Sequence, residues 1–222
     1  MGGLIPLGDA SRRPRGSAAV VLTLILVNAW VFLQELENGQ RFVRIWSAIP
    51  FYVTHGNRVL TLVTSMFLHA SWMHIIGNMV FLWAFGPAME DAMGHRRFLF
   101  FDLSGGIVAM LAQVLAAPSS RIPCLGASGA IAAVMGAFIV TYPRDRIRTL
   151  LFLLIFVRIT FIPAALLIGF WFLTQLFDFG LVAKANAGGV AYLVHIAGFM
   201  YGVIFGRLFM DEGRIAFRQY SE

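Results

Sequence analysis

Six stretches of this chain, each about 17 to 21 residues long, contain at most one charged residue, and this pattern limits the possible folds more than any other feature. An α-helix rises 1.5 Å per residue, so about 20 residues cross the hydrocarbon core of a bilayer. The sequence therefore predicts six membrane-spanning helices. Their expected ranges are Ala18–Gln34, Trp72–Met89, Phe98–Ala117, Gly126–Tyr142, Pro163–Phe179 and Val190–Met210.

The composition supports this fold class. Charged residues make up 13% of the 222 residues and apolar residues 59%, whereas a soluble domain carries about 25% charged residues. So few charges do not cover the surface of a water-soluble globule. The single cysteine, Cys124, permits neither an internal disulfide nor a cysteine-based metal cluster. We therefore exclude a soluble enzyme, a disordered chain and a disulfide scaffold, and predict an all-α, polytopic membrane bundle.

The basic residues predict how the helices are oriented. With the N-terminus in the cytoplasm, twelve of the 17 basic residues lie on the inner side and five on the outer side, and basic residues mark the cytoplasmic side. We therefore expect both termini in the cytoplasm. The same asymmetry explains the isoelectric point of about 10.2 without a nucleic-acid partner. The five outer residues are Arg41, Arg44, Arg58, Arg121 and Lys184.

The remaining segments divide the chain around one membrane domain, residues 18–210. Residues 1–17 are expected as a cytoplasmic N-terminal segment and residues 211–222 as a cytoplasmic tail. The outer connection, about residues 40–71, mixes aromatic and polar residues, which is typical of structure in the headgroup zone. Thr149–Ile162 is apolar but contains Arg158, and is either an interfacial segment or an extension of the fifth helix.

Four polar side chains from three predicted helices fall at a similar depth in the membrane. The second, fourth and sixth helices all run inward, and His74, Asn78, Ser128 and His195 lie within about 10 Å of their outer ends. Polar groups are costly in hydrocarbon, so each is a candidate functional residue. A lone histidine there is as often a packed polar contact, but three segments that converge on one layer favour a site.

Ser128 stands at the expected start of the fourth helix, with Gly126 before it and Gly129 after it. Gly126 permits an unusual turn and the close approach of another backbone. The first N–H groups of a helix have no internal partner and can donate to an anion. A serine nucleophile beside an oxyanion hole needs this arrangement. Alone, however, such a segment is more often a packing surface between membrane helices.

His195 shares one helix face with Gly198 and Gly202, because these residues are spaced by three and by four. Small residues at this spacing allow membrane helices to pack closely. The fourth helix carries small residues at the same spacing, namely Gly129, Ala133 and Ala137. Packing the two faces together would bring the imidazole of His195 to the hydroxyl of Ser128.

His74 and Asn78 are four residues apart and therefore share a helix face, from which both can donate hydrogen bonds to an oxyanion. They are equally consistent with hydrogen bonds between helices. Asp178, at the outer end of the fifth helix, is the only acidic residue expected near this depth. The sequence therefore predicts a Ser–His dyad rather than a Ser–His–Asp triad.

The segments that carry these residues resemble the rhomboid family of intramembrane serine proteases, over roughly Thr64 to Gly206. No single motif is specific, but together they are. The similar segments are His69-Ala70-Ser71-Trp72-Met73-His74-Ile75-Ile76-Gly77-Asn78, Gly86-Pro87-Ala88-Met89-Glu90, Gly126-Ala127-Ser128-Gly129, Trp171 with Gln175, and Gly188-Gly189-Val190-Ala191-Tyr192 followed by His195, Gly198 and Gly202.

The resemblance implies a role for each position. Ser128 would be the nucleophile and His195 the general base, then acid. His74, Asn78 and the backbone N–H of Ser128 would bind the oxyanion. The supporting residues would be His69 and four glycines, Gly126, Gly129, Gly198 and Gly202. The fifth helix would form the gate for substrates, with Phe170, Trp171 and Phe172.

The resemblance also implies partners and a location. Substrates would be single-span membrane proteins, cut near their outer membrane boundary within the lipid bilayer. No cofactor, metal ion or nucleic acid is implied. The six-span layout looks most like a prokaryotic plasma-membrane member with its active site toward the outer face, an organellar membrane being the alternative.

Two positions depart from the family pattern, and neither removes a reacting atom. Leu60-Thr61 stands where members often carry Trp-Arg, and Ala132 stands where some carry an aromatic side chain beneath the histidine. Two other functions remain open. A non-catalytic rhomboid-like module that binds transmembrane segments would need neither Ser128 nor His195. A small transporter would require inverted repeats and broken helices at the midplane, which the sequence does not show.

Overall fold

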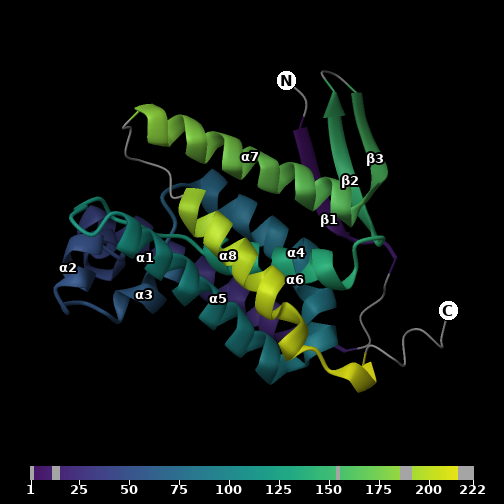
Figure 1. Ribbon diagram of the computed structural model, residues 1–222, viewed down its shortest axis with the longest axis horizontal. Coiled ribbons are helices and arrows are strands. Elements are labelled where there is room, and N and C mark those ends of the chain that lie inside the picture. Colours follow the sequence, from purple (N-terminus) through teal and green to yellow (C-terminus); the bar gives the residue numbers. More distant parts are fainter. Residues whose placement is uncertain (1–2, 12–15, 154–155, 186–191, 215–222) are drawn as a thin grey trace.

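The computed structural model describes residues 3–11, 16–153, 156–185 and 192–214, and its framework is a bundle of long helices (Figure 1). Each long helix overlaps one predicted span, so the predicted helical membrane bundle is confirmed. The helices are α1 (Ala19–Trp46), α4 (Trp72–Met93), α5 (His95–Ala116), α6 (Ser128–Thr141), α7 (Ala164–Ala185) and α8 (Tyr192–Phe205), the last continued by the 3-10 turn η2 (Gly206–Phe209).

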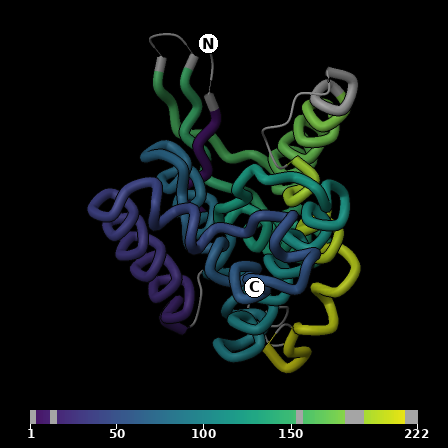
Figure 2. Tube along the Cα trace, turned by 90° about the vertical axis from the view of Figure 1, so that its left-hand side faces the viewer, coloured from purple at the N-terminus to yellow at the C-terminus, as the bar shows by residue number. Residues whose placement is uncertain are grey.

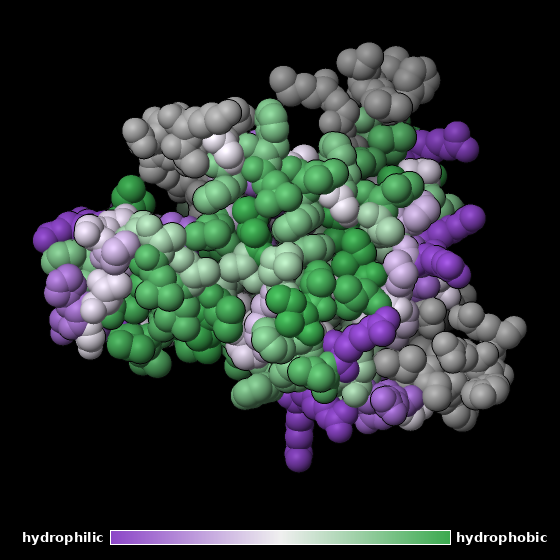
Figure 3. All heavy atoms as spheres, viewed as in Figure 1, coloured by the Kyte–Doolittle hydropathy of each residue, from purple (hydrophilic) through white to green (hydrophobic). Residues whose placement is uncertain are grey.

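Length and apolar composition suit several of these helices for crossing a membrane. Within the described residues, α1, α5 and the segment Tyr192–Phe209 meet both criteria, and α6 and residues 164–180 are shorter apolar helices. Figure 3 shows apolar side chains over the middle of one face, with hydrophilic residues gathered at its left end and along its right and lower edges. A lipid-facing surface has this distribution, because the hydrocarbon core lies between two polar headgroup layers.

The α6 helix forms the centre of the bundle. All of its residues from Gly129 to Phe138 are buried, which is expected of a helix that is apolar on every side. The glycines of α8 pack against it so closely that a Cβ on Gly198 would overlap the carbonyl oxygen of Gly129, and one on Gly202 would overlap that of Ala133. This contact fixes the outer ends of α6 and α8 beside each other.

A buried carboxylate holds the beginning of α1 against α4. The two oxygens of Glu90, which is 1% exposed, each accept a hydrogen bond of 2.9 Å, one from the N–H of Val20 and one from the N–H of Val21. These N–H groups belong to the first turn of α1 and have no partner within the helix. The positive end of the helix dipole and the negative carboxylate therefore stabilise each other.

The outer connection is helical rather than irregular. The α1 helix extends beyond the predicted end at Gln34 as far as Trp46, with a kink at Gly39, where φ is 64°. Its outward continuation consists largely of good helix formers such as Leu, Glu, Gln and Arg. Three short helical segments then lead to α4, and they are α2 (Pro50–Thr54), α3 (Thr61–Thr64) and η1 (Ser65–Phe67).

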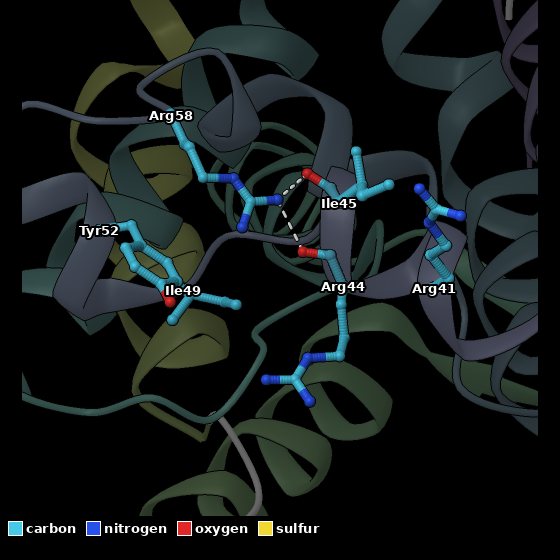
Figure 4. A pocket seen from close by; sticks show the side chains of 6 residues that line it. All are labelled: Arg41, Arg44, Ile45, Ile49, Tyr52 and Arg58. Carbon is cyan, nitrogen blue, oxygen red and sulfur yellow. Dashed lines mark hydrogen bonds between the residues drawn. The ribbon is translucent and has the colours of Figure 1, made fainter.

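Arg58 anchors this connection to the end of α1. Its guanidinium donates hydrogen bonds to the carbonyl oxygens of Arg44 and Ile45 and lies 5.5 Å from the ring centre of Tyr52 (Figure 4). Because the last carbonyl groups of a helix lack internal partners, a cation is well placed there. The side chain of Thr61 also donates to the carbonyl oxygen of Arg58 at 2.6 Å. The loop with Leu60-Thr61 is therefore anchored without the Trp-Arg pair that is common in the family it resembles.

The segment Thr149–Ile162 contributes to two strands, so it is not an extension of the fifth helix, whereas its interfacial placement stays a prediction. It belongs to β2 (Arg146–Leu153) and β3 (Phe156–Pro163), which form an antiparallel hairpin, and β1 (Gly3–Asp9) pairs with β2 on its other side. Residues 3–9, expected only as a cytoplasmic segment, thus supply the third strand. Figures 1 and 2 show the sheet and α7 extending from the same side of the bundle.

The alternation of buried and exposed residues explains why this segment forms strands. Ile147 and Thr149 are fully buried, whereas Arg146 and Arg148 are exposed, so alternate residues face opposite sides. Half of the residues of β3 are β-branched, which favours a strand, namely Val157, Ile159, Thr160 and Ile162. Arg158 therefore lies on an exposed strand, not in a helix.

Candidate active site

The structure brings the hydroxyl of Ser128 and the imidazole of His195 into direct contact. Nε2 of His195 lies 2.8 Å from Oγ of Ser128. Ser128 is the first residue of α6, and His195 lies in the first turn of α8. The contact follows from the glycine-mediated packing of these two helices, which holds their outer ends together.

Gly126 shapes the backbone just before Ser128. Its φ is 125°, which side-chain-bearing residues rarely adopt, and its N–H donates to the carbonyl oxygen of Ser65 at 2.9 Å. A Cβ on Gly126 would lie 2.9 Å from the ring of His74. Glycine is therefore required by both backbone conformation and space. As a result, the free N–H groups at the start of α6 lie beside the hydroxyl of Ser128.

His74 presents a hydrogen-bond donor toward this turn. Its Nδ1 accepts a hydrogen bond of 3.3 Å from the N–H of Ala70, and Ser71 caps the start of α4 by accepting from the N–H of His74. In a neutral imidazole, a nitrogen that accepts carries no proton, so the proton is on Nε2. Nε2 and the adjacent Cε1 are the ring atoms nearest to Gly126.

Asn78 supplies a second donor one turn further along α4. The residue is 8% exposed, and its amide Nδ2 has no hydrogen-bond partner within the described part of the chain. A buried amide donor without a partner is costly, unless a ligand or a reaction intermediate satisfies it.

These side chains line one cavity of about 210 Å³ between α4, α6, α7 and α8. Four of its lining residues are polar, and apolar residues from α4, α6 and α7, with Gly77, form the rest. The lining residues are Met73, His74, Gly77, Asn78, Phe81, Ser128, Ile131, Met135, Trp171 and His195. The cavity therefore brings a hydroxyl, two imidazoles and an amide together in an otherwise apolar space.

His69 lies next to His74 and is not among the residues that line the cavity. It is 2% exposed, and its ring lies edge-on to that of His74, with 5.1 Å between the ring centres. Burial, together with the nearby His74, lowers the pKa of His69 to about 4. The imidazole is therefore neutral at physiological pH. Cys124, which lies outside the cavity, is buried in a short β-bridge with Ala48, and burial raises the pKa of its thiol to about 11.

Comparison with known proteins now bears on this arrangement. The family model for the rhomboid domain matches residues 56–212, which include all of the side chains just described that line the cavity. The chain belongs to the rhomboid family.

Three relatives illustrate the similarity. Rhomboid protein 1, mitochondrial, of Saccharomyces cerevisiae is 28% identical over 195 residues, which is 84% of this chain and 52% of that protein. Presenilin-associated rhomboid-like protein A, mitochondrial, of Danio rerio is 30% identical over 58% of this chain and 32% of that protein. RHOMBOID-like protein 12, mitochondrial, of Arabidopsis thaliana is 33% identical over 56% of this chain and 42% of that protein. The matches span between a third and about half of these relatives.

The expected location in a prokaryotic plasma membrane is wrong. The three relatives named above are mitochondrial, and a further relative from Arabidopsis thaliana is chloroplastic. Rhomboid relatives of this kind point to an organellar membrane. The six-span layout on which that expectation was based describes the membrane domain, and it carries no information on which membrane holds the protein.

The three expected gate residues of the rhomboid fold differ in their surroundings. Trp171 lines the cavity, with its ring centre 5.9 Å from that of His195. Phe172 stacks on Phe199 of α8 at 4.2 Å, whereas Phe170 is 63% exposed on the outside of the bundle. Ala132 is fully buried at the α6–α8 contact, so Trp171, and not an aromatic residue on α6, lies beside the histidine.

Two buried polar residues contact the site without having been assigned a role from sequence. Oε1 of Gln175 lies 2.7 Å from Nδ1 of His195. The carboxylate of Glu35 accepts the N–H of His69 at 2.9 Å and so ties α1 to the segment before α4. In the sequence, each is visible only as a polar residue within or beside an apolar helix. The residue that each contacts cannot be predicted in this way, because it lies on another segment, distant in sequence.

Within the described residues, no group of three or more His, Cys, Asp or Glu side chains is arranged to hold a metal ion.

Proposed function

We propose that this protein is an intramembrane serine endopeptidase that hydrolyses peptide bonds in or near transmembrane segments of other membrane proteins. The observation that carries the proposal is the 2.8 Å contact between Nε2 of His195 and Oγ of Ser128 at the wall of the cavity. A serine nucleophile and its base need this distance, about 2.6–3.2 Å. Membership of a family that includes serine proteases supports it.

The acylation step uses the two dyad residues. Oγ of Ser128 attacks the scissile carbonyl carbon while Nε2 of His195 takes the hydroxyl proton. The tetrahedral intermediate collapses, the C–N bond breaks, and His195 gives this proton to the leaving amine. Water then attacks the acyl carbon while His195 accepts its proton. The bond between the acyl carbon and Oγ breaks, the new carboxylic acid leaves, and His195 returns the proton to Ser128.

The oxyanion would be bound by donors from two helices. Nε2–H of His74, the unpartnered amide of Asn78 and the backbone N–H of Ser128 all lie around the nucleophile. Donors that are already oriented stabilise the developing charge more in a water-poor site than in bulk water. No metal or cofactor takes part in these proposed steps.

Substrates would reach the cavity from the lipid between α4 and α7. The cavity has walls from both helices, and the outward-facing side of α7 is strongly apolar, with Phe170, Leu173 and Phe177 more than 60% exposed. A transmembrane substrate must first unwind, because its hydrogen-bonded backbone hides the scissile carbonyl. We therefore propose α7, including Phe170–Phe172, as the gate, and single-span proteins with helix-weakening residues near the cut as substrates.

The test is cleavage of a single-span model substrate by purified protein in liposomes. We expect Ser128→Ala to abolish cleavage, and Ser104→Ala to retain it, since Ser104 contacts Tyr201 outside the cavity. A fluorophosphonate probe should label the wild type and the Ser104 variant, but neither Ser128→Ala nor His195→Ala. Cleavage by Ser128→Ala would refute the proposal. Substrate binding by the wild type without cleavage or labelling would favour the non-catalytic module instead.

A further inference from the structure

The dyad continues into a third side chain on α7. Gln175 is 8% exposed, and its Oε1 lies 2.7 Å from Nδ1 of His195, whose Nε2 contacts Ser128. The three side chains come from three helices, α6, α7 and α8. The order hydroxyl, imidazole, hydrogen-bonding side chain is that of a triad, but the third member is a neutral amide.

The neighbours of Gln175 determine which way its amide points. Nε2 of Gln175 lies 3.3 Å from the carbonyl oxygen of Trp171 and 3.0 Å from Oγ1 of Thr174. The hydroxyl of Thr174 donates to the same carbonyl oxygen at 2.6 Å, so it accepts from Gln175. A carbonyl oxygen can only accept, and therefore the NH₂ group must face Trp171. The oxygen Oε1 is left to face His195.

This orientation selects one tautomer of His195. Oε1 can only accept, so the proton of a neutral imidazole must be on Nδ1. Nε2 then has a free lone pair directed at the hydroxyl of Ser128. This is the form in which a histidine acts as a general base, and the other tautomer has a proton where the base must accept one.

We propose that Gln175 is a positioning residue, which holds His195 in its catalytic tautomer and makes that state depend on the position of α7. The proposal rests on the proposed protease function. Since Gln175 lies on the helix proposed as the gate, displacement of α7 removes the acceptor from Nδ1. Movement of α7 to admit a substrate and the tautomer of His195 are then linked through one hydrogen bond. The ring of Trp171 lies beside that of His195, tilted by 41°, but it makes no hydrogen bond to a ring nitrogen in the described structure and so selects no tautomer.

The experiment compares second-order rates of fluorophosphonate labelling at Ser128 for the purified full chain in liposomes, over a range of pH. Gln175→Leu fills similar space without an acceptor, and we expect it to label about 10²-fold more slowly, the loss typical of a misplaced catalytic group. Gln175→Glu keeps an acceptor, so labelling at neutral and alkaline pH is largely restored. The acidic limb of its profile should lie at higher pH, because a carboxylate favours the protonated ring.

Controls separate this role from packing. Gln113→Leu makes the same substitution on α5, and we expect its labelling rate to equal that of the wild type. His74, the other titratable residue in the cavity wall, is the same in every variant. If Gln175→Leu does not yield folded protein, Gln175→Met makes the same comparison with a flexible side chain.

Two results would overturn the inference, and a third concerns the proposed function. Labelling of Gln175→Leu at the wild-type rate, or a rate loss that Gln175→Glu does not restore at any pH, contradicts the positioning role. Absence of labelling in the wild type contradicts the protease function itself. Because the wild type and the variants are read separately, the two failures are distinguishable.

Discussion

Each of the two histidines in the cavity has one neighbour that decides which of its ring nitrogens is available. Ala70 occupies Nδ1 of His74, and Gln175 occupies Nδ1 of His195, so both rings present Nε2 to the cavity in opposite protonation states. One ring is thereby a donor and the other an acceptor. Two histidines in the same cavity can therefore perform different chemistry, without any acidic residue among those that line it.

At the same scale, Asn78→Ala tests the oxyanion donor. The amide has no other partner in the described structure, so its removal should affect the transition state and not the substrate complex. We expect kcat for cleavage to fall on the order of 10²- to 10³-fold with KM little changed. The matched change Asn38→Ala, at an exposed position of α1, should leave both constants unchanged. A raised KM with unchanged kcat would assign Asn78 to substrate binding.

At the scale of the elements, the contact between α6 and α8 positions the dyad. Backbone meets backbone there, because Gly198 and Gly202 face carbonyl oxygens of α6. Close contact of this kind lets van der Waals packing hold two membrane helices together. Three further links connect distant elements, namely Glu90 to α1, Arg58 to the end of α1, and Glu35 to His69.

Gly202→Ala should therefore disturb both stability and activity. Its Cβ would overlap the carbonyl oxygen of Ala133, and overpacking costs about 1–3 kcal/mol. We expect a lower melting temperature in detergent and slower labelling of Ser128, because α8 must shift and carries His195 with it. Gly169→Ala, which meets open space on α7, is the matched control and should retain both. An unchanged Gly202→Ala variant would show that this contact does not position the dyad.

At the scale of the whole molecule, the bundle and the sheet have separate roles. The dyad, the oxyanion donors and the cavity belong to helices, whereas β1, β2 and β3 contribute none of the residues that line it. The sheet packs beside the start of α7 through Ile147, which joins Ala164 and Ile168 in the buried core. It therefore supports one end of α7 and, through β1, packs against α4, while none of its residues lines the cavity.

Deleting residues 3–9 tests this division. Loss of β1 leaves a two-stranded hairpin with an unpaired β2 edge, and such hairpins have little stability of their own. We expect a lower melting temperature, while the labelling rate of Ser128 remains close to that of the wild type. Loss of labelling in a sample that still melts cooperatively would instead connect the sheet with the site.

Much of this architecture was predictable from local pattern. Each apolar stretch overlaps one long helix, because a segment in hydrocarbon must satisfy its own backbone hydrogen bonds. The small residues at Gly198 and Gly202 and the polar layer around Ser128 were visible as spacings, because helix geometry turns spacing into a shared face. Hydropathy alone does not predict the strands 146–153 and 156–163, because it does not distinguish an apolar strand from an apolar helix.

The sequence by itself determined that the chain is a helical membrane protein and which helix faces carry its polar and small residues, because these properties depend on neighbours along the chain. Only the tertiary structure decided that Gln175 meets His195, that Glu35 holds His69, and that residues 3–9 pair with β2. Each of these contacts joins segments far apart in sequence. The packing of helices and strands decides which residues meet, and the composition of neighbouring residues does not predict that packing.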